Sequence, residues 1–137
     1  MKNFIFGLMT LMLSVSALAV EISAPDALLS ILRPGTYTGV SSDCTMTLEE
    51  YQDGVLVTAQ KGNKKLQRFI QDGTQYRPGP ARYFLSSERS RARNSVNYTE
   101  EIFMTRAGRL GQYMVVEHIK VENRRSQKET IECEVSL

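Results

Sequence analysis

Of the residue types that can bind a ligand, arginine is the one most clustered in this sequence. Three of them alternate with small residues in one polar stretch, and two more precede that stretch. In an extended segment alternate side chains share a face, so the three close arginines would form a local basic patch. Guanidinium groups bind phosphate and carboxylate in a bidentate manner, which predicts an anionic ligand or an acidic protein partner. The alternative is a solvated loop whose arginines pair with surface carboxylates. The five arginines are Arg77, Arg82, Arg89, Arg91 and Arg93.

The single histidine, His118, is the residue on which hydrolytic catalysis would depend. A hydrolase would pair it with a nucleophilic serine and a carboxylate. The sequence has no Gly-x-Ser-x-Gly segment. The acid pairs Glu49-Glu50 and Glu100-Glu101 lie in strand-like segments, where neighbouring side chains point to opposite faces. We therefore predict no enzyme, no catalytic residue and no cofactor, and keep a small hydrolase using His118 as the least favoured alternative.

Two cysteines lie in strand-like segments at opposite ends of the chain. Apolar and polar residues alternate through Cys44–Leu48 and again through Ile131–Leu137. Both cysteines fall on the apolar face, and an exported chain with two cysteines favours a disulfide. Two separate buried thiols are the alternative. Oxidised cysteines cannot bind zinc, so no metal site is predicted.

The first nineteen residues have the three parts of a secretory signal peptide. Lys2 precedes an apolar run from Phe4 to Val20, and Ala17-Leu18-Ala19 supplies the small-residue cleavage site. We expect cleavage after Ala19, which leaves residues 20–137 as one β-rich domain in the periplasm or outside the cell. A retained membrane anchor is the alternative, although the run is near the lower length limit for spanning a bilayer.

The charge balance excludes a general affinity for polyanions. The chain carries 17 basic and 15 acidic side chains, and loss of the leader removes Lys2 and no acid. The mature chain would therefore hold 16 basic and 15 acidic residues. A net charge near zero predicts no nucleic-acid binding, and we expect no membrane span after processing.

Turn residues divide the remaining chain into short strands. Ser23–Leu32 is predicted as a short capped helix, because Ser23 can cap it and Arg33-Pro34-Gly35 ends it. Tyr37–Val40 and Asp43–Tyr51 are expected to form one bent strand, and Asp53-Gly54 a two-residue hairpin turn. Ser86–Ser95 is predicted as a polar loop. About eight strands joined by short connections are expected.

Short connections in series indicate an antiparallel meander, which either closes into a barrel or divides into two packed sheets. We expect an all-β fold, a small up-and-down barrel or strongly curled meander in which Cys44–Cys133 joins the first strand to the last. A sandwich would place the same disulfide between its sheets. The segment Gly35-Thr36-Tyr37-Thr38-Gly39 resembles lipocalin-like barrels, and no function is carried over from so short a match.

These observations favour a non-catalytic binding or interaction domain. Its partner would be a small apolar or anionic ligand, or an envelope or extracellular protein. The alternative is a secreted inhibitor that inserts a loop, Arg77–Pro80 or Glu88–Asn94, into a hydrolase. A ligand could also occupy the barrel interior. The side chains expected there are Met46, Met114, Tyr37, Tyr83, Tyr98 and Leu110.

Overall fold

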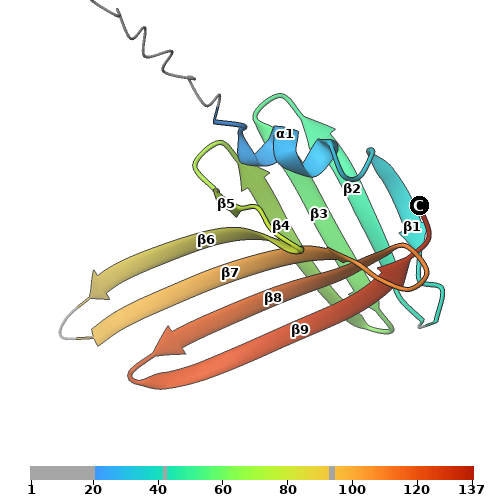
Figure 1. Ribbon diagram of the computed structural model, residues 1–137. Helices are drawn as coiled ribbons and strands as arrows, with labels where there is room; N and C mark the ends of the chain where they lie inside the picture. The colour runs from blue at the N-terminus through green and yellow to red at the C-terminus, as the bar shows by residue number, and fades with distance from the viewer. Residues whose placement is uncertain (1–20, 42, 93–94) are drawn as a thin grey trace, which may run out of the picture.

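Nine strands and one short helix make up the described part of the chain. The structure is a computed structural model that describes residues 21–41, 43–92 and 95–137 (Figure 1). One sheet contains β1 (Gly35–Thr38), β2 (Thr45–Tyr51), β3 (Gly54–Lys61) and β4 (Lys64–Gln71). The second contains β5 (Gln75–Arg77), β6 (Ala81–Ala92), β7 (Ser95–Ala107), β8 (Gln112–Glu122) and β9 (Arg125–Val135).

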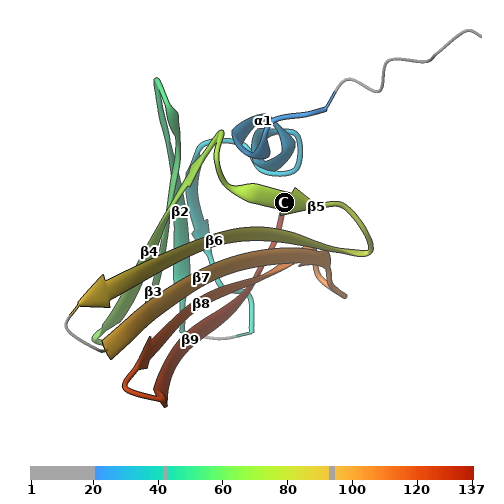
Figure 2. The same ribbon diagram turned by 90° about the vertical axis from the view of Figure 1, so that its left-hand side faces the viewer.

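The all-β antiparallel prediction is confirmed, but the closed barrel is not found. Within each sheet every strand pairs with its sequence neighbour, whereas β4 and β5 belong to different sheets. At the other edge, the backbone pairing between the sheets in the described residues is a bridge between Gly39 and Val135, extended by the Val40 amide donating to the Glu134 carbonyl. The four-stranded sheet lies steeply across the five-stranded one (Figure 2).

The predicted single bent strand at the start of the domain is wrong. β1 and β2 are antiparallel partners, with Tyr37 opposite Met46, so the chain reverses direction between them. Cys44 lies just before β2 and its partner Cys133 lies in β9. The expected turn at Asp53-Gly54 is also displaced by one residue, because Gly54 already pairs with Tyr51.

The predicted polar loop over Ser86–Ser95 is mostly strand. β6 continues through Ala92 and β7 begins at Ser95, with Ala92 opposite Ser95 in the ladder. The polar composition of Ser86–Ser95 is the reason that a loop was predicted. A strand that faces solvent on both sides needs no apolar alternation, so its residues have the composition of a loop.

Apolar side chains fill the space between the two sheets. Phe84 and Phe103 lie opposite each other on β6 and β7, with ring centroids 5.6 Å apart. Met46 and Met114 are fully buried in the same cluster, and Tyr37 packs against it. Tyr83 and Leu110, which were expected inside, are exposed. The interior around Met46 and Met114 is therefore a packed core.

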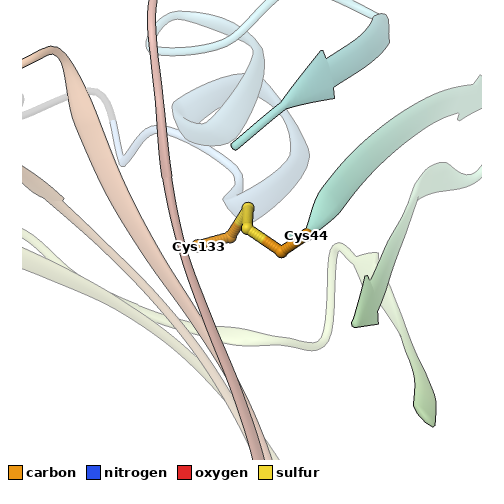
Figure 3. The surroundings of a disulfide bond; sticks show 2 residues. All are labelled: Cys44 and Cys133. Carbon is orange, nitrogen blue, oxygen red and sulfur yellow. A yellow bond between two sulfur atoms is a disulfide. The ribbon is translucent and has the colours of Figure 1, made fainter. Parts of the chain in front are cut away.

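The Cys44–Cys133 disulfide joins the two sheets through this core, and the prediction of the disulfide is confirmed (Figure 3). The two Cα atoms are 5.9 Å apart and both residues are almost fully buried. The bond closes a loop of 89 residues. It therefore restricts most of the domain in the unfolded state.

A helix of six residues, α1 (Ala24–Leu29), precedes the sheets. Ser23 caps it, because its Oγ accepts from the Asp26 amide at 3.3 Å and donates to the Asp26 carboxylate at 2.7 Å. Ala27 and Leu28 are buried in the core, and the helix packs beside β4 and β5. The predicted signal peptide lies outside the described residues. Within the described part, no helix combines the length and apolar character needed to cross a bilayer.

Candidate binding surface

The five-stranded sheet extends well beyond the region that the four-stranded sheet covers. The crossing point is marked by Arg68 of β4, which bonds the Glu117 carbonyl of β8, and by Lys64 Nζ, which donates to the Thr130 carbonyl of β9 at 3.3 Å. Past this line four strands continue together to two hairpin ends (Figure 1, Figure 2). We call this part the overhang. It comprises Ser86–Ala92, Ser95–Glu101, His118–Glu122 and Arg125–Glu129.

A polar cluster marks the boundary between the core and the overhang. Arg68 is only 6% exposed, and its Nε and Nη2 donate to the Glu117 carbonyl at 3.1 and 2.9 Å. Its Nη1 donates to the Gln67 carbonyl and lies 3.4 Å from Glu101 Oε1. Burial lowers the pKa of the Arg68 guanidinium, while the carboxylates of Glu101 and Glu129 act in the opposite direction. The charged group thus fixes where β4 crosses β8.

Glu101 is the centre of this cluster. Its Oε1 lies 3.4 Å from His118 Nδ1 as well as from Arg68, and its Oε2 accepts from Ser86 Oγ at 3.5 Å. A serine hydrolase needs the imidazole between the hydroxyl and the carboxylate. Here the carboxylate lies between them, so Glu101 holds Ser86 and His118 in place and the group lacks the order of a nucleophilic triad.

Three of the five predicted arginines have described side chains, and these lie on both faces of the sheet. Arg77 lies opposite Tyr83 and Arg89 lies opposite Tyr98, so the two rows are six positions apart along β6. At about 3.3 Å per residue the rows are about 20 Å apart. Arg82 lies opposite the buried Thr105, on the alternate face of β6.

The remaining two arginines are only partly placed. The backbone of Arg91 pairs with Val96, its side chain lies outside the described part, and Arg93 lies outside it entirely. The structure therefore leaves Arg89 as the one predicted arginine whose described side chain lies in the overhang.

A second set of cations, missed by the sequence argument, comes from the neighbouring hairpin. Arg124 and Arg125 are exposed at the β8–β9 turn, and Lys120 is exposed two residues before the end of β8. The ladder aligns Arg89, Tyr98, Val121 and Ser126 in one row across four strands. We call Arg89, Lys120, Arg124 and Arg125 the basic tip.

The signal for the basic tip was present in the sequence as the pair Arg124-Arg125. It could be used only together with the topology, since consecutive hairpins of a meander end on the same side at every second turn. Lys120 Nζ pairs with Glu122 at 3.2 Å. The Arg89 guanidinium lies 5.4 Å from the centre of the Tyr98 ring, a cation–π distance.

Open hollows accompany these charges. One, of about 480 Å³, lies at the β8–β9 end and is lined by Lys120, Glu122 and Arg125 among others. Another, of about 600 Å³, is lined by apolar side chains that include Pro78, Tyr83 and Ile102, and it reaches Glu100 of the overhang. Neither lies inside the core. Among the described residues no three histidine, cysteine or acidic side chains are grouped to hold a metal ion.

Comparison with known proteins gives no match to a protein-family model, to a curated protein or to a solved structure.

Proposed function

We propose that this chain is an exported, non-catalytic binding domain that engages its partner through the overhang. The observation that carries the proposal is the length of β6–β9 beyond the crossing of β4. Strands that only enclose a core would end where the core ends. These strands continue with exposed polar and charged side chains, which supports an interaction surface on a rigid scaffold.

The disulfide supports the proposed location. A buried Cys44–Cys133 bond is consistent with an oxidising compartment, since such bonds are rare where thiols are kept reduced. We propose the periplasm or the cell exterior, reached after cleavage of the predicted leader. A small apolar ligand would bind in the open hollow near Pro78 and Tyr83, because the core cluster is filled with side chains.

A second candidate function is inhibition of a hydrolase. The observation that favours it is the pair of hairpin ends lying side by side beyond the core (Figure 1). The adjoining ends of β6–β7 and β8–β9 form a projection of the kind that can enter a substrate cleft. The loop Arg77–Pro80 would be less suited, since it lies about 20 Å away from the Arg89 row.

Site-specific photocrosslinking in the source cells tests the proposed surface. A photoreactive residue replaces exposed Ser87 in the overhang, and in a control it replaces exposed Glu49 in β2 of the other sheet. We expect Ser87 to yield one reproducible crosslinked protein and Glu49 to yield none. Crosslinks from Glu49 alone, or from neither position, would refute the overhang as the binding surface.

A further inference from the structure

The basic tip brings together cations that are about 30 residues apart in sequence. The row Arg89, Tyr98, Val121 and Ser126 spans three strand spacings, about 14 Å at roughly 4.8 Å each. Arg125 is adjacent to Ser126, so it lies next to the end of this row, but its side chain falls on the opposite face of the sheet, as do those of Lys120 and Glu122. The tip is therefore a projection that carries cations on both faces.

The charge of this surface is largely uncompensated. Within the described residues, Lys120 pairs with Glu122, but no carboxylate forms an ion pair with Arg89, Arg124 or Arg125. The rest of the chain is close to neutral. The positive charge is thus a local property of the overhang end.

The β8–β9 turn has arginine at a position where the backbone conformation favours glycine. Asn123 and Arg124 have φ values of 48° and 65°, the left-handed region needed at both central positions of a type I′ hairpin turn. Asparagine tolerates this conformation, but glycine is the favoured residue at the second position. Arg124 breaks that preference, and such local exceptions cluster at functional sites.

We propose that the partner is a protein with a carboxylate-lined recess, and that the basic tip enters it. This proposal rests on the overhang being the binding surface. Arginine forks bind carboxylates in a bidentate manner, and tyrosine and arginine are the residue types that contribute most to protein interfaces. Arg89 held over Tyr98 is ordered before binding, so it loses less conformational freedom on contact.

The acidic residues near the tip favour a protein over other anions. Glu88 and Glu122 lie among the cations, so the surface is mixed rather than uniformly positive. A membrane or a repeating anionic polysaccharide presents negative charge everywhere and would meet these glutamates as well. A protein partner can position carboxylates opposite the arginines and leave the glutamates unopposed.

Charge reversal at the tip tests the proposal in the Ser87 crosslinking assay. The double variant R124E/R125E is compared with K61E/K65E, which reverses two exposed lysines in the other sheet and changes net charge equally. We expect the tip variant to lose about tenfold or more of the crosslinked product, and the control to stay within about twofold. Arg124→Gly removes one charge and relieves the turn. A loss of crosslinked product in this variant would therefore not come from misfolding.

Several outcomes would overturn the carboxylate recess. If R124E/R125E retains the wild-type yield, the partner contacts another part of the overhang, and the proposed function stands while this inference fails. If no Ser87 product forms in the wild type, the proposed function fails first. Binding of purified protein to phosphatidylglycerol vesicles or to heparin that R124E/R125E abolishes, without a protein crosslink, would assign the tip to a lipid or a polysaccharide.

Discussion

Arg68 is expected to be the main polar link between the two sheets, so its replacement should weaken the whole fold. In Arg68→Met the protein loses two hydrogen bonds to the Glu117 carbonyl and one to the Gln67 carbonyl. Each is worth about 1 kcal/mol net. The ion pair with Glu101 adds less than about 1 kcal/mol, because that carboxylate is 33% exposed.

Part of this loss is recovered in the variant. A buried guanidinium pays a desolvation cost, which is also why its pKa is lowered, and methionine has no such cost. We therefore expect the free energy of unfolding to fall by about 2–3 kcal/mol. For a domain of this size each kcal/mol corresponds to a decrease in Tm of about 3–6 °C.

Urea unfolding followed by far-ultraviolet circular dichroism measures this change, since the chain has no tryptophan. Glu101→Gln removes the ion pair and keeps the backbone bonds, so it should cost about 1 kcal/mol or less. Lys65→Met, the control for losing an exposed cation of β4, should change stability by less than about 0.5 kcal/mol. The reasoning is wrong if the stability of Arg68→Met stays within about 0.5 kcal/mol of wild type, the scale of a surface substitution. It is also wrong if Glu101→Gln lowers the free energy of unfolding by more than Arg68→Met does.

Three further predictions concern the disulfide, the turn and a tyrosine. Replacing both Cys44 and Cys133 with alanine should lower the free energy of unfolding by up to about 4–5 kcal/mol, measured in urea; a loss below about 1 kcal/mol would contradict the chain-entropy argument. Arg124→Gly should raise Tm, with a gain of about 1 kcal/mol in calorimetry, whereas a lower Tm would show that the arginine stabilises the turn. The Tyr113 hydroxyl donates to Glu132, which raises the pKa of Tyr113 above its ordinary value of 10. A raised folded-state pKa gives stability that is present below pH 10 and is lost as the pH rises through the folded-state pKa. Tyr113→Phe should therefore be less stable than wild type at neutral pH, by less than about 1 kcal/mol, and the gap should narrow in alkaline denaturation curves; a gap that widens would contradict the hydrogen bond.

The local structure of several segments follows from the sequence alone. Alternation around Cys44 and Cys133 predicted strands with buried cysteines; both cysteines are buried, Cys133 within β9 and Cys44 just before β2. The prediction depends only on the two-residue period of a strand. Short connections likewise predicted an antiparallel meander. Side chains two positions apart must share a face wherever the strand lies, so the pattern needs no knowledge of the neighbours.

The candidate site depended on features that no local pattern contains. Ser86–Ala92 has the composition of a loop, and only its pairing with β7 makes it a strand. The predicted arginine patch combined Arg77 with Arg89, which the ladder separates, and omitted Arg124, which it brings near. Residues distant in sequence become neighbours through strand register, and register is set by turns and by packing across the sheet.

The sequence by itself therefore determined the all-β class, the antiparallel connections and the disulfide, because each follows from periodicity, turn chemistry or cysteine number. Only the tertiary structure decided that the meander divides between β4 and β5 into two crossed sheets. That division depends on how twisted sheets pack around one core, a long-range balance that no short segment encodes. It also determines where β4 crosses β8, at Arg68, and therefore which parts of β6–β9 extend beyond the four-stranded sheet as the overhang.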